Sequence, residues 1–231
     1  MTDVGGTPES RAELVSKLSH EVRGPVSTLR GLVGTTLAHY DRLSDDERRE
    51  FLRLIKHEAD RLERSVEQVA LALKLDAGSV RLDIERRDLG AIVREAVEGA
   101  ETGDHPVDVD AAASLEAPVD GVLIAEVVHQ LIDNAMMFSP PDAPISVRVR
   151  RDGDDAVVEV VDGGPGVPPD KREAVFERFA GWRPPDYEDR PGAGLGLFIT
   201  RTVARRHGGE ASIAEGPAGG TMLIVRLPVE G

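Results

Sequence analysis

The chain has 231 residues, with 28 Lys and Arg against 42 Asp and Glu, so its formal net charge at pH 7 is -14. It contains no cysteine, which excludes a disulfide-stabilised scaffold and a zinc site built on thiolates. The negative balance argues against a general binder of nucleic acid or anionic membranes, because both classes neutralise phosphates with Lys and Arg.

Two apolar stripes at helical spacing run through the first third of the chain, where acidic and basic residues balance. The stripes consist of Leu14, Leu18, Val22, Pro25, Leu29 and Leu32, and of Phe51, Ile55, Ala59, Leu62, Val66, Val69 and Leu73. Residues 44–47 fit a capping box, with Ser44 as N-cap and Glu47 at the third helical position. Gly78 follows where a C-terminal cap is expected. The pattern predicts a helical hairpin with a turn at residues 40–43.

The hairpin has no third helix in this region against which to pack. Two helices of about 30 residues would each leave an apolar stripe half exposed to water in a monomer. Pairing two hairpins into a four-helix bundle would bury both stripes. We therefore predict a homodimer.

His20 lies two positions from both Leu18 and Val22, so it is expected to point away from the stripe and toward solvent. Pro25 removes the amide that would bond the carbonyl of Glu21, which predicts a bend or a loosened turn near His20. A neutral imidazole offers one nitrogen lone pair as a nucleophile, and a neighbouring carboxylate can take or orient the proton on the other nitrogen. Taken alone, the segment better fits an ordinary surface histidine beside a surface acid.

The rest of the chain carries most of the net negative charge and mixes strand and helix patterns. Strands are predicted at residues 80–86, 107–112, 145–149 and 157–161, with the turn of an antiparallel hairpin at 152–155. Helices are predicted from the cap Asp88 through residue 100, at 123–137 and at 198–207, followed by one more strand pair. This order predicts an α+β fold, in which one sheet is covered on one side by helices.

Two glycine-rich loops carry the chemical signal. Residues 162–166 follow directly on a strand, and residues 192–197 precede a helix. Glycines let backbone amides approach a ligand closely, and a helix N-terminus favours negative charge, so the pattern indicates a phosphate cradle. A dinucleotide fold also uses such a loop, but near the start of a parallel unit with an acid about 20 residues on. Here the second loop lies near the C-terminus, which disfavours that alternative.

Six segments in this order resemble the motif set of a sensor histidine kinase core, and together they span almost the whole chain. They are the phospho-acceptor box at 19–25, the N box at 130–140, glycine boxes at 162–166, 192–197 and 219–221, and the F box at 175–179. The resemblance implies a dimerisation and histidine phosphotransfer hairpin at residues 10–78. It also implies an ATP-binding α/β two-layer sandwich of the gyrase type at residues 79–231.

The resemblance also implies roles for individual residues. His20 would be phosphorylated with Glu21 as its base, Asn134 would hold Mg²⁺ against the phosphates, Phe138 would lie against the adenine ring and Asp162 would accept its amino group. Residues 180–191 would form a lid over ATP. The glycine boxes would contribute Gly164, Gly166, Gly192, Gly194, Leu195, Gly196 and Thr221 to the ATP site. The implied partners are a second copy of the chain and a response-regulator receiver domain, with no nucleic acid.

The sequence departs from the family pattern at three positions. Gln130 stands where these kinases usually have Asn and gyrase-type ATPases have the Glu that activates water; an amide cannot act as that base. Met137 replaces a usual lysine, which removes one charge that contacts the phosphates. The candidates for a cation near the site are then Arg178, Arg183 and Arg190. Gly24 stands where bifunctional members usually carry Thr or Asn, so phosphatase activity toward the partner is not expected.

These features favour an ATP-dependent protein histidine kinase that autophosphorylates His20 and passes the phosphoryl group to a response-regulator aspartate. Two alternatives stay open: a degenerate pseudokinase that binds nucleotide or only a partner, and a serine kinase or ATPase on the same ATP fold. No run of about 18 apolar residues and no secretory signal is apparent in the sequence. We therefore expect a cytoplasmic location, for a complete chain or for the soluble part of a longer protein.

Overall fold

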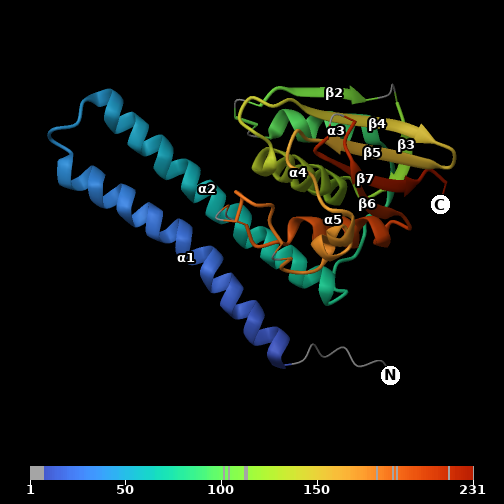
Figure 1. Cartoon of the computed structure of the whole chain (residues 1–231), viewed down its shortest axis with the longest axis horizontal. Coiled ribbons are helices and arrows are strands. Elements are labelled where there is room, and N and C mark those ends of the chain that lie inside the picture. The colour runs from blue at the N-terminus through green and yellow to red at the C-terminus, as the bar shows by residue number, and fades with distance from the viewer. Residues whose placement is uncertain are drawn as a thin grey trace. The chain divides into compact units, whose positions relative to one another are not determined.

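The computed structural model describes residues 8–231 except 101, 104, 112, 113, 181, 189, 191, 218 and 231, and for residues 8–21 it describes the backbone alone. The chain divides into two compact units (Figure 1). The first contains residues 1–77 and 191–193, and the second contains residues 78–190 and 194–231.

The first unit is a hairpin of the helices α1 (Pro8–His39) and α2 (Asp45–Asp76), as the apolar stripes predict. The capping box is confirmed: the Ser44 hydroxyl accepts the Glu47 N–H at 3.3 Å, and the Glu47 carboxylate accepts the Ser44 N–H at 2.7 Å. Gly78 has φ +64° just beyond the C-cap Ala77, in the left-handed region that ends helices. Helix α1 stays continuous through Pro25.

Apolar side chains remain exposed along both helices of the hairpin. They include Val22, Val26, Val33 and Leu37 on α1, and Leu52, Leu54, Val66 and Leu73 on α2. Leu37 is 71% exposed and Leu52 is 60% exposed, which is unusual for large aliphatic side chains gathered on one hairpin. The described part of the hairpin therefore keeps apolar surface that its own two helices do not cover.

The second unit is built on a five-stranded sheet in the order β2-β4-β5-β7-β6. Its strands are β2 (Val107–Ala111), β4 (Ile145–Asp152), β5 (Asp155–Val161), β6 (Glu210–Glu215) and β7 (Thr221–Pro228). The β2–β4 pair is parallel and the other pairs are antiparallel. A separate antiparallel pair joins β1 (Glu85–Asp88) to β3 (Glu116–Val119).

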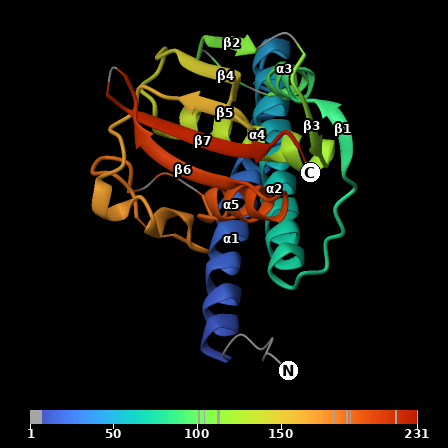
Figure 2. The same cartoon turned by 90° about the vertical axis from the view of Figure 1, so that its right-hand side faces the viewer.

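Three helices cover one face of the five-stranded sheet, as Figures 1 and 2 show. They are α3 (Leu89–Gly99), α4 (Gly121–Phe138) and α5 (Gly196–Arg206). Alternate residues of the strands point into this layer, so that Val147, Val160 and Val225 are at most 1% exposed. The two-layer α+β architecture and the preceding hairpin are as predicted.

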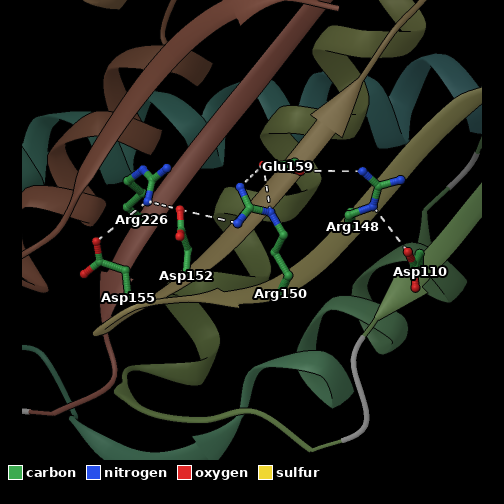
Figure 3. Close-up of polar contacts among 7 residues, drawn as sticks. All are labelled: Asp110, Arg148, Arg150, Asp152, Asp155, Glu159 and Arg226. Atoms are coloured by element: carbon green, nitrogen blue, oxygen red, sulfur yellow. Dashed lines mark hydrogen bonds and ion pairs between the residues drawn. The ribbon is translucent and has the colours of Figure 1, made fainter. Parts of the chain in front are cut away.

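The opposite face of the sheet is covered by a ladder of charged side chains with alternating sign (Figure 3). In order along the ladder these are Asp110, Arg148, Glu159, Arg150, Asp152, Arg226 and Asp155. Arg150 donates to Glu159 at 2.7 Å, and the Glu159 side chain is only 9% exposed. Between Arg150 and Arg226 on this face, Val157 is fully buried, because arginine stems cover apolar surface while their charges stay in water.

Two strand predictions need correction. The strand expected at residues 80–86 is displaced to β1, because strands need a partner and only residues 85–88 pair with β3. Upstream of β1, the Asp83 N–H instead donates to the Asp120 carboxylate, and the Val80 carbonyl accepts from Arg206. Strand β3 itself was missed, because four residues that include Pro118 give little periodic signal.

By length and composition alone, helix α4 is long and apolar enough to cross a membrane. The sequence analysis did not identify this segment as a candidate. Core helices of soluble proteins pass the same test. In this fold α4 packs against the sheet, with Val128, Leu131, Ile132 and Ala135 fully buried. The helix therefore serves here as the central helix of the layer.

A buried histidine ties the start of α4 to the end of α5. His207 is 8% exposed; its Nδ1 lies 2.8 Å from the Val203 carbonyl, and its Nε2 accepts the Asp120 N–H at 3.0 Å. This geometry assigns the proton to Nδ1. Asp120 in turn caps α4 by accepting the N–H groups of Val122 and Leu123. The helix that carries Asn134 and Phe138 is thus joined at its start to the end of the helix that begins at Gly196.

Candidate functional site

Asp162 is the polar centre of the candidate site. It follows β5 directly and is 3% exposed. Its Oδ1 accepts the N–H groups of Gly164 at 2.8 Å and Thr221 at 3.1 Å, so the first and last glycine boxes meet on one oxygen. Burial raises the pKa of this carboxyl, against the opposing effect of these hydrogen bonds. Such a group can orient a ligand through its second oxygen.

The glycines around Asp162 are required by close backbone packing. A Cβ on Gly164 would lie 2.7 Å from the Phe138 carbonyl oxygen, and one on Gly166, which has φ +76°, would lie 3.1 Å from the Gly220 oxygen. Gly220 has φ +78°, and its Cβ would lie 2.1 Å from the Asp162 oxygen. The end of α4 and two glycine boxes therefore pack backbone against backbone, as a cradle for a ligand requires.

Neighbouring Gly219 and Gly220 allow a matched test of this packing. Gly219 also has positive φ, +86°, but nothing lies within 4 Å of its hypothetical Cβ. Gly219→Ala should cost about 1–2 kcal/mol of unfolding free energy, the penalty for a left-handed alanine. Gly220→Ala must also displace the Asp162 backbone, so we expect a total above about 3 kcal/mol. Urea denaturation of both variants measures the difference, and equal losses would contradict the close packing.

The second glycine box joins α5 to two other parts of the site. Gly194 has φ +67°, and a Cβ there would lie 2.6 Å from the oxygen of Ala180, the first residue of the predicted lid. Leu195 is 2% exposed and precedes α5 without a side-chain cap. A Cβ on Gly196 would lie 2.6 Å from Oε1 of Gln130. The first turn of α5 thus rests on the N box, with its amide end uncapped by side chains.

Gln130 makes a contact that the sequence did not reveal. It is 5% exposed, its Oε1 faces Gly196, and its Nε2 donates to Glu126 Oε1 at 2.5 Å. The departure from the family pattern therefore places a buried amide between α4 and α5. Asn134 follows one turn later on the same helix and is half-buried.

Phe138 ends α4 and contacts lid residues. Tyr187 and Arg183, one of the three candidate cations, both lie against its ring. Arg190 lies on Tyr187 instead. Arg178 lies at Phe198 in a separate groove of about 490 Å³ between the F box and α5. The sequence offered one signal for Tyr187: it is one of only two tyrosines in a chain poor in aromatic residues.

Three predicted site residues are not placed with this group. The side chains of His20 and Glu21 lie outside the described residues, although their backbone belongs to α1. Gly192 has φ +148° and falls in the unit of the helical hairpin. The structure thus brings Gly164 and Thr221 onto one oxygen of Asp162, and it places Phe138 against Gly164. Gly166 packs against Gly220 in the same cradle, and Gly196 packs against Gln130 on the N-box helix, which also carries Asn134. The functional roles of all these residues stay predictions.

Family comparisons match both parts of the chain. Residues 10–78 match the His Kinase A (phospho-acceptor) domain, and residues 119–231 match the histidine kinase-, DNA gyrase B-, and HSP90-like ATPase family.

The most similar proteins found include named sensor kinases. The chain is 30% identical to Sensor protein KdpD of Mycobacterium tuberculosis over 227 residues, covering 95% of this chain and 26% of that protein. It is 29% identical to the sensor-like histidine kinase SenX3 of the same organism, covering 98% of this chain and 56% of that protein. The chain therefore spans between about a quarter and just over half of these relatives.

A solved structure agrees with the sequence relatives. The mycobacterial sensor histidine kinase MprB is 30% identical and superposes with a TM-score of 0.55, covering 63% of this chain and 97% of that one. The histidine kinase AdeS of Acinetobacter baumannii, at 18% identity and a TM-score of 0.67, shares the fold over 92% of this chain. With both domain families, the relatives and the cradle at Asp162 in agreement, the chain belongs to the sensor histidine kinases and represents their catalytic core.

Proposed function

We propose that the chain is an ATP-dependent protein histidine kinase that autophosphorylates His20 and passes the phosphoryl group to a response-regulator aspartate. Residues 10–78 would form the dimerisation and phosphotransfer domain and residues 79–231 the ATP-binding domain. The observation that carries the proposal is the buried Asp162, whose Oδ1 is engaged by two glycine-box amides. The Thr221 hydroxyl also hydrogen-bonds this carboxyl. A carboxylate offers about four acceptor positions, so Asp162 can still accept a further hydrogen bond from the amino group of adenine.

The roles of the other residues follow from their positions. Phe138 would lie against the base, and the glycine boxes with the uncapped start of α5 would receive the phosphates. Asn134 offers an amide oxygen, which suits Mg²⁺; this ion commonly uses one or two protein groups together with substrate phosphates. Among the described residues no cluster of three or more His, Asp or Glu forms a metal site by itself. When bound, Mg²⁺ would neutralise charge on the phosphates.

The transfer itself needs one nucleophile and one base. A nitrogen of the neutral His20 ring attacks the γ-phosphorus in line, the bond to the β–γ bridging oxygen breaks, and ADP leaves with that electron pair. The proton on the other ring nitrogen passes to Glu21 or is held by it. Gln130 cannot serve as a base for water, which favours transfer to the protein over simple hydrolysis.

The exposed apolar residues of the hairpin support a homodimer. Leu37, Leu52 and their neighbours on α1 and α2 would be buried by a second hairpin in a four-helix bundle. Because ATP and receiver domains are cytosolic, we place this catalytic core in the cytoplasm. Light scattering that shows a monodisperse monomer at micromolar concentration would overturn the dimer.

Labelling with γ-³²P ATP and Mg²⁺ tests the reaction. A histidine kinase gives a label on the chain that acid removes and alkali does not, because a phosphoramidate is labile to acid. An acid-stable label would instead identify a serine kinase. No label together with retained nucleotide binding would identify a pseudokinase, the alternative that Gln130 and Met137 favour.

A further inference from the structure

Four side chains at the end of α4 and in the lid form one continuous stack. The ring centroids of Phe138 and Tyr187 lie 5.8 Å apart at an interplanar angle of 49°. The Arg183 guanidinium lies 5.8 Å from the Phe138 centroid, and that of Arg190 lies 5.5 Å from the Tyr187 centroid. These separations fall within the ranges of about 4.5–7 Å for aromatic pairs and about 6 Å for cation–π contacts. We call these four residues the lid stack.

The lid backbone fixes where Tyr187 sits. Its N–H donates to the Pro184 carbonyl at 3.1 Å, which closes a four-residue turn. Pro185 takes the second position of that turn, and Asp186, with φ +70°, takes the third. A proline followed by a positive φ is the pattern of a type II turn. The Arg190 N–H then donates to the Tyr187 carbonyl at 3.0 Å, so Tyr187 lies between two consecutive turns.

We infer that Tyr187 is a positioning residue for ATP, which acts through Phe138 by holding the lid at the base end of the site. The inference rests on the proposed function, in which Phe138 lies against adenine. Loss of the Tyr187 ring would remove both its contact with the Phe138 ring and its contact with the Arg190 guanidinium. The lid would then spend less time at Phe138, and the nucleotide would dissociate more readily.

The single tryptophan of the chain reports on the lid directly. Trp182 is half-buried beside Arg183, which donates to its carbonyl at 3.3 Å. We would titrate the whole chain with Mg²⁺ and a non-hydrolysable ATP analogue, following Trp182 emission and its quenching by acrylamide. Tyr187→Ala should bind the analogue about 3- to 10-fold more weakly and expose Trp182 to quencher. At saturating ATP, its labelling rate should stay near wild type, so the change appears in KM.

Two variants serve as controls. Tyr187→Phe removes only the hydroxyl and should stay within about twofold of wild type in both readouts. Tyr40→Ala removes the other tyrosine, which lies in the helical hairpin and stacks with Arg48 at 4.5 Å, and should leave both readouts unchanged.

The outcomes separate this inference from the proposed function. A wild-type chain that does not bind the analogue overturns both. If wild type binds and Tyr187→Ala binds equally or more tightly, or with unchanged Trp182 quenching, the inference alone is wrong. It is equally wrong if Tyr187→Phe loses as much affinity as Tyr187→Ala.

Discussion

An Asp162→Asn chain is expected to bind ATP at least about 100-fold more weakly while keeping its fold. The asparagine carbonyl oxygen can still accept the two amides of Gly164 and Thr221, which now bond Oδ1. The second position, however, becomes an NH₂ donor that faces the amino group of adenine, so two buried donors oppose each other. Isothermal titration with Mg²⁺ and a non-hydrolysable ATP analogue measures the loss.

Titration of the Asp162 carboxyl makes the difference in stability between wild type and this variant depend on pH. Folding raises the pKa of the Asp162 carboxyl through burial, so the folded state holds this proton more tightly than the unfolded state. The resulting stability is present below the unfolded pKa and is lost as pH rises through the folded pKa. At pH 7, Asp162→Asn should therefore be at least as stable as wild type, and this advantage should vanish near pH 3.

A matched control uses a carboxyl outside the cradle. The Asp170 side chain is 71% exposed and pairs with its neighbour Lys171. Asp170→Asn should leave ATP affinity unchanged. If Asp162→Asn also kept wild-type affinity, Asp162 would not be the group that recognises the base.

Replacing His20 with alanine is expected to abolish the acid-labile label completely. Only a nucleophile can take the phosphoryl group, and alanine has no lone pair to offer. Nucleotide affinity should be unchanged, because all the proposed ATP contacts except Gly192 lie in the other unit. Two measurements on His20→Ala check this prediction: incorporation of label into the chain and release of inorganic phosphate from ATP. Loss of the label identifies His20 as the residue that accepts the phosphoryl group.

The hairpin supplies the control for His20. His39 lies on the same helix and its side chain is exposed. His39→Ala should keep full labelling. Label that survived His20→Ala but vanished in His39→Ala would move the phosphorylation site to the end of α1.

Elements with strong local signals were predictable from the sequence. The capping box at Ser44, the cap Asp88 and the hairpin between β4 and β5 all depend on residues close together in the chain, and all appear as expected. Strand β1 was misplaced and β3 was missed, because their extent is set by pairing with each other across 27 or more residues. Local periodicity contains no information about such a partner.

In the candidate site, too, local features could be predicted from the sequence and contacts between distant segments could not. The glycine boxes could be recognised because positive φ and close backbone approach leave few residues other than glycine. The contact of Gln130 with the start of α5 and that of Tyr187 with Phe138 join segments more than 45 residues apart in sequence. Both contacts form only when the layer of helices and the lid are folded. No pattern along the chain could therefore predict them.

The hydrogen bond from the Asp120 N–H to His207 fixes the start of α4, and Phe138 lies at the other end of the same helix. The helix is fixed at its first residue by buried polar contacts and carries Phe138 at its last. Its 18 residues measure about 27 Å, so a tilt of about 2° at the fixed end would displace Phe138 by about 1 Å. Because Phe138 is proposed to lie against adenine, a displacement of that size would change how the base fits the site. The buried contacts of His207 at one end of α4 thus help to set the position of Phe138 at the other end.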